Sequence, residues 1–308
     1  MPMTLTIRDF SPADAEAAAA AHCAGRPHLV LTAQVFAWLP EHLPAAQHYR
    51  TFVAEIDGRV VGSVRCGRVV DTSAEGIAYA NGSVLPEFRR RGAFTALLAA
   101  AERHLAEHGA TEVHSWVDDV PEALAFAAGR GYRQGRLAHF ARRDLTAPLP
   151  PVPVAPAGVE LRTAADYQDD PYPLFVVDAD AGRDEPGEVD IDRADYQDWL
   201  DGVWSRPDLD RDMTVVALVD GSPAAFSAAH TDGRSRYWSA FTACRREFRG
   251  RGLATLAKIR SLHLAQAAGL TEAFTNNDAT NAPMLAINER LGYRRCASER
   301  KFVKQLTL

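Results

Sequence analysis

The sequence predicts an α/β protein that contains two tandem copies of one domain. A strand, a loop rich in arginine and glycine, and a long helix follow one another twice, and a shift of 160 residues places Arg89–Gly92 on Arg249–Gly252. An Asp-Gly pair between two β-prone runs marks a hairpin in each copy. Between the copies, residues 146–158 hold five prolines, which predicts a semi-rigid extended linker.

In the first copy, alternating and β-prone runs predict a series of strands, and Asp57-Gly58 is the turn of its hairpin. Ser11 and Pro12 suit the N-cap and the first position of an alanine-rich helix. The other helices are expected after the loop, at the second motif and in a region interrupted by prolines. The expected strands are 5–8, 52–56, 60–64, 77–85 and 111–117, and the further helices 33–49, 94–108 and 122–130.

The second copy repeats this order with one addition, a long irregular acidic insert over 166–192. Asp220-Gly221 is its hairpin turn, and Gly269 is a suitable residue to follow the end of its long helix. The remaining expected elements are a strand at 159–162, an amphipathic helix at 195–204, a strand ending at 244, a helix at 253–268, strands at 272–276 and 300–306, and a helix opened by Asn281.

Two motifs of the second copy resemble those of the GCN5-related N-acetyltransferase (GNAT) superfamily. Arg249-x-x-Gly-x-Ala254 is similar to its pyrophosphate loop, and Asn281 to Tyr293 is similar to its second motif. The resemblance covers roughly 213–308 well. It implies two GNAT-type domains, each a mixed, mostly antiparallel sheet flanked by helices, packed as a pseudo-dimer within a monomer. The expected division is 1–146, a linker at 147–158, and 159–308.

The loop has the physical features of an anion site. A helix N-terminus carries unpaired N–H groups and a partial positive charge. Glycine permits close approach to the backbone, and arginine adds charge, although arginine-glycine turns also occur without a ligand. The resemblance implies acetyl-CoA as the cosubstrate, with Asn281 either contacting its pantetheine arm or only capping a helix. The expected coenzyme contacts are Thr242, Ala243, Cys244, Arg249, Gly250, Arg251, Gly252, Leu253, Ala254, Asn276 and Asn281.

The two copies differ where the chemistry is expected. In the first copy, Phe94 stands where the family has a small residue, Val120 where it has Asn, and Ala127 where it has Tyr. We therefore expect the second copy to hold the coenzyme and the first to support it or to shape the acceptor cleft. Whether the first loop, with Arg89, Arg91 and Gly92, also binds acetyl-CoA is left open.

Asn288 occupies the position at which the family commonly has a tyrosine that protonates the leaving thiolate. An amide can donate a hydrogen bond to the sulfur but cannot serve as that acid. Asn288 is the catalytic candidate on this basis, with water or Tyr293 as other proton sources, although Tyr293 is also expected as a core aromatic. The base is left open among residues expected to face a cleft, which are Tyr237, His230, Asp180, Asp184 and Glu185.

The predicted function is direct transfer of an acetyl group from acetyl-CoA to a primary amine of a small molecule. Acetylation of a protein or peptide N-terminus is one alternative, and a non-catalytic acyl-CoA sensor or scaffold is another. The missing tyrosine and the altered first copy motivate the sensor hypothesis.

Composition limits the other classes of function. The chain has 308 residues, 47% of them hydrophobic and 24% charged, and a formal net charge of −6, which argues against nucleic acid as a main partner. No membrane-spanning run or signal peptide is evident, so a cytoplasmic protein is expected. The four cysteines are widely spaced, which predicts reduced thiols and no metal site.

Overall fold

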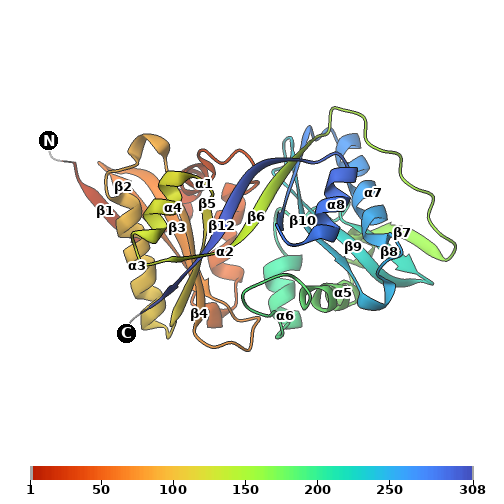
Figure 1. The fold of residues 1–308 in the computed structure, drawn as a ribbon, viewed down its shortest axis with the longest axis horizontal. Helices are drawn as coiled ribbons and strands as arrows, with labels where there is room; N and C mark the ends of the chain where they lie inside the picture. The colour runs from red at the N-terminus through yellow and green to blue at the C-terminus, as the bar shows by residue number, and fades with distance from the viewer. Residues whose placement is uncertain (1–2, 307–308) are drawn as a thin grey trace. The chain divides into compact units, whose positions relative to one another are not determined.

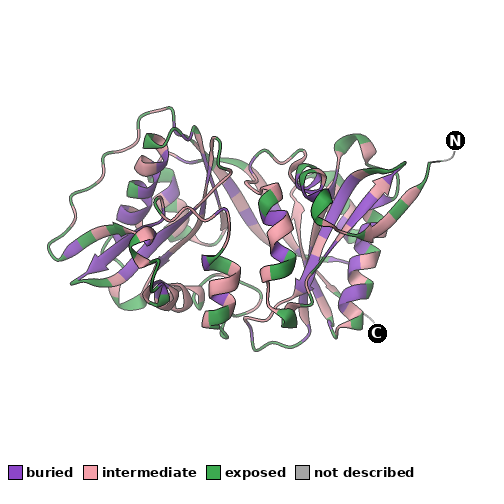
Figure 2. Ribbon diagram, turned by 180° about the vertical axis from the view of Figure 1, so that it is seen from behind, coloured by how far each residue is buried: buried purple, intermediate pink, exposed green. Residues whose placement is uncertain are grey.

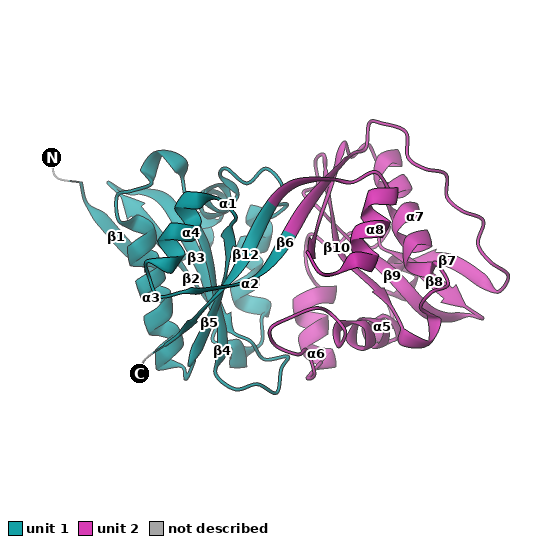
Figure 3. Cartoon of the chain, in the orientation of Figure 1, with its two compact units in different colours: residues 1–138, 298–308 teal, residues 139–297 magenta. Residues whose placement is uncertain are grey.

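The computed structural model describes residues 3–306. These form two compact units, coloured separately in Figure 3: unit 1 is Met1–Ala138 together with Ser298–Leu308, and unit 2 is His139–Ala297. The expected division, with boundaries at 146 and 159, differs from these units in two ways. The first unit ends earlier, at Ala138, and the C-terminal residues from Ser298 on belong to unit 1. The second part of the last strand, from Ser298 on, belongs to unit 1 because its backbone pairs with a unit 1 strand, from Glu299–Asp118 to Gln305–Glu112.

Unit 1 has a six-stranded sheet in which one neighbouring pair is parallel, β4 with β5, and the other described pairs are antiparallel. It is therefore mixed and mostly antiparallel, as expected. Its strands, in sheet order, are β1 (Leu5–Asp9), β2 (Arg50–Ile56), β3 (Arg59–Arg68), β4 (Ile77–Val84), β5 (Glu112–Asp118) and the second part of β12 (Arg294–Gln305). Its helices are α1 (Ala15–Cys23), α2 (Ala33–His42), α3 (Ala93–Glu107) and α4 (Pro121–Ala128).

Both faces of the unit 1 sheet are covered by helices. Consecutive side chains of a strand point to opposite faces, and on β2 the neighbours Val53 and Ala54 belong to different core clusters. Val53 packs with residues of α1 and α2, whereas Ala54 packs with residues of α3. Figure 2 shows the buried residues concentrated along the strands and on the inner sides of these helices. Two hydrophobic layers therefore hold unit 1 together.

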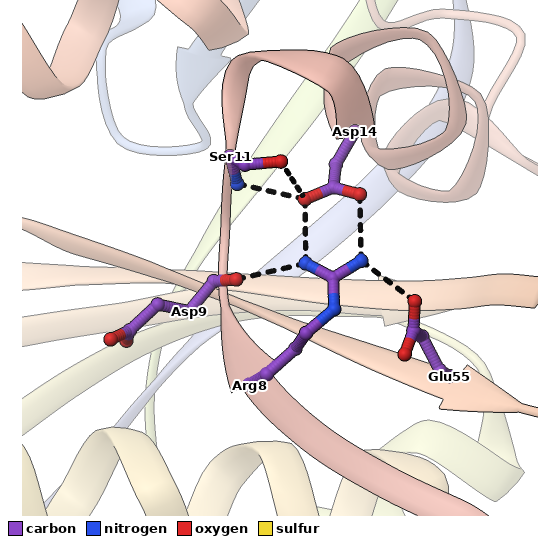
Figure 4. A network of polar contacts seen from close by, with 5 residues as sticks. All are labelled: Arg8, Asp9, Ser11, Asp14 and Glu55. Atoms are coloured by element: carbon purple, nitrogen blue, oxygen red, sulfur yellow. Dashed lines mark hydrogen bonds and ion pairs between the residues drawn. The ribbon is translucent and has the colours of Figure 1, made fainter. Parts of the chain in front are cut away.

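Arg8 joins three segments at the start of the chain (Figure 4). Its guanidinium donates to both carboxylate oxygens of Asp14 at 2.7 and 2.8 Å and to Oε1 of Glu55 at 2.7 Å. Asp14 also accepts the backbone N–H of Ser11 at 2.7 Å. The hydrogen bonds from Arg8 lower the pKa of Asp14 to about 2. The predicted helix thus begins with a 3₁₀ turn at Pro12–Asp14 that is tied to β1 and β2, and α1 follows it.

Unit 2 repeats the architecture, with the sheet order β6, β11, β10, β9, β8, β7. Figure 1 labels these strands except β11. β10 and β11 form its parallel pair, and β7–β10 are successively antiparallel. Its strands are the second part of β6 (Arg133–Asp144), β7 (Val159–Thr163), β8 (Val215–Val219), β9 (Ser222–Thr231), β10 (Arg236–Cys244) and β11 (Glu272–Asp278). Its helices are α5 (Tyr172–Gly182), α6 (Tyr196–Trp199), α7 (Leu253–Ala267) and α8 (Ala282–Arg290), with a π-helical turn at Leu200–Trp204.

The prediction of an irregular insert over 166–192 is wrong, because α5 lies inside it. Leu174 and Val177 are buried on one side of α5, which packs on β9 and β10, and they share a core cluster with Phe226 and Ala243 of those strands. The acidic residues of the stretch hide this short apolar stripe in the sequence. The burial of that stripe on the sheet stabilises the helix, as is usual for helices in proteins.

The proline-rich segment has no helix or strand from Leu145 to Gly158, as predicted. It does not span open solvent, because Leu149 and Val152 pack against core clusters of unit 2. The imidazole Nε2 of His263 on α7 also lies 2.9 Å from the carbonyl oxygen of Pro150. The linker is thus part of the surface of unit 2.

Candidate functional site

In unit 2 the parallel strands β10 and β11 separate after a short contact. They pair over three residues, from Arg236–Glu272 to Trp238–Phe274, and β10 then continues to Cys244 and β11 to Asp278. Beyond Trp238, the ladder described for β10 is with β9 only. An edge of β10 next to the opening can therefore accept an extended ligand as a strand would.

A bulge lies at the start of this opening. The register of β10 against β9 shifts between Ser239 and Phe241, so that Ala240 is the extra residue. Such a residue is left out of the ladder, and bulges are frequent next to active sites. In unit 1, the corresponding strand β4 pairs with β3 without a shift throughout the described register. The extra backbone group is therefore a difference between the two copies.

The loop after β10 has the expected geometry. A 3₁₀ turn at Arg246–Phe248 leads to Gly250 and Gly252, whose φ angles of 76° and 77° lie in the left-handed region that glycine adopts readily. Gly252 is the N-cap of α7 and leaves the helix without a side-chain cap. A Cβ added at either glycine would meet no heavy atom within 4 Å. The glycines therefore add no side chain to the first turn of α7, and the same holds for Gly92 in unit 1.

The two arginines Arg249 and Arg251 have different surroundings, and a neighbouring acid holds the first. Arg249 donates through Nε to the carbonyl oxygen of Cys244 at 3.1 Å, and its Nη1 lies 2.7 Å from Oδ2 of Asp184. Arg251 instead lies over the ring of Phe248, with 5.7 Å from Cζ to the ring centroid. Positive charge thus gathers beside the helix N-terminus, as an anion site requires.

The end of β10 is shaped by its backbone rather than by reactive side chains. Thr242 places its Oγ1 3.4 Å from Oγ of Ser227 on β9, and Ala243 is buried. Cys244 is half-buried, and burial raises the pKa of its thiol. A thiol with a raised pKa is a poor nucleophile.

The second motif places Asn281 and Asn288 on α8. Oδ1 of Asn281 accepts the N–H of Met284 at 3.3 Å, so the capping alternative is present in the structure. Asn288 is buried and donates from Nδ2 to Oδ1 of Asn277 on β11 at 2.6 Å. Within residues 3–306 its own Oδ1 is buried and has no hydrogen-bond partner. Asn276, beside Asn277 on β11, is half-buried.

The candidate bases have different positions. Tyr237 was expected to face a cleft, and this is wrong: its side chain is fully buried and its hydroxyl lies 2.8 Å from Oγ of Ser261 on α7. Nδ1 of His230 lies 3.7 Å from Oδ2 of Asp208, and burial lowers the pKa of its imidazole to about 4. Asp180 and Asp184 contact the loop at Arg246.

Two residues that the sequence analysis missed stand out in unit 2. Asp178 on α5 accepts the indole N–H of Trp199 at 2.8 Å, and burial raises the pKa of its carboxyl to about 7. Asn277 orients Asn288. The alternation of side chains along β11 could have indicated Asn277, whereas Asp178 gave no signal because α5 itself was not predicted.

In unit 1 the start of the equivalent helix carries bulky side chains. The ring of Phe94 lies 5.4 Å from that of Phe126, and the guanidinium carbon of Arg130 lies 3.4 Å above Phe126. Arg130 also bonds the hydroxyl of Thr95 in the first turn of α3. The 160-residue repeat puts Ala254 at the position of Phe94, so unit 2 lacks the phenyl ring at this helix start.

Comparison with known proteins gives the class. The family model described as "Acetyltransferase (GNAT) family" matches twice, at residues 20–132 and 166–293. The chain therefore belongs to the GNAT family and is an acyltransferase with two GNAT domains in tandem. Enzymes of this family use acetyl-CoA.

Particular relatives are similar at modest identity. A mycothiol acetyltransferase of Acidothermus cellulolyticus is 30% identical over 68% of this chain and 66% of its own length, just under two thirds. A mycothiol acetyltransferase of Nocardia farcinica is 29% identical over 81% of this chain and 80% of its own.

Solved structures support the fold. A tandem GNAT protein from the clavulanic acid biosynthesis pathway has a TM-score of 0.74 at 21% identity, covering 98% of both chains. A GCN5-related N-acetyltransferase of Sphaerobacter thermophilus has a TM-score of 0.71 at 22% identity, covering 98% of this chain and 95% of that one.

Two other kinds of feature are absent from the part of the chain that the structure describes. Over residues 3–306, no cluster of three or more His, Cys, Asp or Glu side chains is suited to a metal ion. In the same part of the chain, no helix is both long and apolar enough to cross a membrane.

Proposed function

We propose that unit 2 binds acetyl-CoA along β10 and at the start of α7, and transfers the acetyl group directly to a primary amine of a small molecule. The observation that carries this proposal is the opening between β10 and β11, which has a bulge at Ala240 and leads to a helix start with no side-chain cap and with the small residue Ala254. The mycothiol acetyltransferases similar to this chain support a small-molecule acceptor.

The residues of unit 2 fit such a donor. The N–H groups of Leu253 and Ala254, with Arg249 and Arg251 nearby, would hold the diphosphate. The backbone from Thr242 to Cys244 would pair with the amides of the pantetheine arm. Acetyl-CoA, when bound, supplies an acyl group activated as a thioester.

The chain itself would promote transfer through position and polarity. Held next to the acyl group, the amine attacks without the entropic cost of a bimolecular encounter. The backbone N–H of Ala240, outside the ladder, can donate to the carbonyl oxygen as it becomes negative. Asn288 has a second N–H on Nδ2 besides the one given to Asn277, and this can stabilise the departing sulfur. No proton needs to leave Asn288 in this role.

Binding to the loop is tested by Gly252→Asp in the full-length chain. The new carboxylate would face the diphosphate, so calorimetry should show CoA affinity reduced at least tenfold, about 1.4 kcal/mol. Gly252→Asn is the matched control, since asparagine has the same shape without the charge and tolerates positive φ better than most residues. Gly92→Asp makes the same change in unit 1 and should matter little. If Gly252→Asp left CoA affinity unchanged and Gly92→Asp abolished binding, the coenzyme site would lie in unit 1 and the proposal would be wrong.

A non-catalytic acyl-CoA sensor is the second candidate, and the buried amide of Asn288 at the tyrosine position favours it. The two functions differ in turnover. Release of CoA from acetyl-CoA in the presence of a panel of amines identifies an enzyme, whereas tight binding without release across the panel identifies a sensor.

A further inference from the structure

Asp184, just after α5, binds two arginines of the candidate coenzyme loop. Its Oδ2 lies 2.7 Å from Nε of Arg246 and 2.7 Å from Nη1 of Arg249, and its Oδ1 lies 2.6 Å from Nη2 of Arg246. Asp180, one turn earlier, accepts the backbone N–H of Arg246 at 2.9 Å. The end of α5 thus presents its carboxylates to the loop, although 62 residues separate Asp184 from Arg246.

The first copy has a loop arginine, Arg89, in the same place, and within the described residues 3–306 it forms no ion pair with an acid. A Cβ added to Gly25, just after α1, would lie 3.5 Å from Nη2 of Arg89. In both copies, therefore, the loop arginine reaches the segment that follows the first helix. Among residues 3–306, a carboxylate stands at this contact only in unit 2, the copy with Ala254 instead of a phenyl ring at the helix start.

The contact with Asp184 occupies the guanidinium groups that a bound diphosphate would contact. The hydrogen bonds from Arg246 and then Arg249 lower the pKa of Asp184 to about 2, so its carboxylate stays charged at neutral pH. The three side chains are between 35% and 53% exposed, so solvent weakens these ion pairs. A diphosphate carries more negative charge than one carboxylate and adds contacts to the helix N–H groups, so it can displace the weaker anion.

We propose that Asp184 is an internal competitor for the coenzyme's phosphates: it holds Arg246 and Arg249 in the free protein and leaves them when an anionic ligand arrives. This rests on the proposed coenzyme site. Binding then releases the segment 183–195, which connects α5 to α6. Affinity for the donor is lower than the loop alone would give, and ligand binding is coupled to the mobility of a segment outside the loop.

The test is Asp184→Asn in the full-length protein, titrated with CoA and, separately, with inorganic pyrophosphate. Asp190→Asn is the matched control, because Asp190 is exposed in the same segment and the substitution removes the same charge. Asp184→Asn should bind both ligands three- to tenfold more tightly than the wild type, a range expected for two solvent-exposed ion pairs. This gain in affinity should exceed the gain of Asp190→Asn and should shrink at high salt. It should vanish when Arg249 is also replaced by Gln.

Hydrogen exchange supplies a readout that a general charge effect would not move. Amides of 183–195 should exchange faster when wild type is saturated with pyrophosphate, and this acceleration should be absent in Asp184→Asn, whose segment is already released. Equal affinities in the Asp184 and Asp190 variants, or weaker binding in Asp184→Asn, would overturn the inference. If CoA binds to none of the proteins, the proposed function fails, and the pyrophosphate titration still decides whether Asp184 competes.

Discussion

Lys258 on α7 should reduce the stability of unit 2 at neutral pH, and its replacement by Met should raise it. The side chain is 1% exposed, and Nζ lies 5.3 Å from the ring centroid of Tyr293. Burial alone lowers the pKa of the amine from 10.5 to about 7, with no acidic partner contributing in the described chain. The repeat places Leu98, a buried core residue of α3, at the equivalent position. An apolar side chain therefore suits this site.

The sign and size of the effect of Lys258 on the free energy of unfolding follow from proton binding. Between pH 7 and 10.5 the unfolded chain holds the Lys258 proton and the folded chain does not, so stability rises with pH over this range and the penalty is complete below about pH 7. Each pH unit of pKa difference corresponds to about 1.4 kcal/mol. The penalty at pH 7 is thus about 4 kcal/mol, an order of magnitude that Lys258→Met should recover in large part because it nearly conserves volume.

Urea unfolding followed by tryptophan fluorescence, at pH 6.5, 8 and 9.5, measures this difference. The Met variant should unfold at higher urea than wild type at pH 6.5, and the gap should narrow as the pH rises. Hydrogen exchange of the α7 amides localises the effect to unit 2, and Leu98→Lys in unit 1 should produce the reverse change. A Met variant that is less stable at pH 6.5, or a gap independent of pH, would refute the argument that an uncompensated amine is buried here.

Asp14→Asn should destabilise unit 1 by about 2 kcal/mol at pH 6, because the folded pKa of Asp14, about 2, lies below its usual 3.8. Since this stability is present above pH 3.8 and is lost as the pH falls toward 2, denaturation at pH 6 and at pH 3.5 should show a shrinking difference, with Asp9→Asn, on an exposed carboxylate, as the control. Asn288→Ala should lower turnover about ten- to a hundredfold by loss of one oriented hydrogen bond, with CoA affinity nearly unchanged. Its pH–rate profile should keep both limbs, because an amide does not titrate; unchanged turnover would remove Asn288 from the mechanism.

Local chemistry explains the parts of the fold that could be predicted from the sequence. Asp57 and Asp220 each precede a glycine, and both pairs have positive φ, as the predicted hairpin turns require. Gly92 and Gly252 have φ angles of 83° and 77° at the starts of equivalent helices. In these turns the residue type itself restricts the backbone. The sequence was therefore sufficient to locate both loops and the duplication.

Predictions failed where packing outweighed local pattern. The helix α5 forms because its few apolar residues are buried on the sheet, and an acidic composition concealed them. Tyr237 lies on a strand beside the candidate site, but its side chain is buried against α7. Strand alternation alone did not reveal which face α7 covers, so the sequence placed this hydroxyl wrongly in a cleft.

The sequence by itself determined the family, the duplication, the two glycine loops and the copy with the small residue at Ala254, since each depends on residues close together in the chain. The tertiary structure decided that the second part of β12 completes the sheet of unit 1, that β10 has its bulge at Ala240, and that Asp184 meets Arg249. It also placed Lys258 in the core. Such contacts join residues that are distant in sequence, and the burial and strand pairing of the whole unit, rather than any local preference, bring them together.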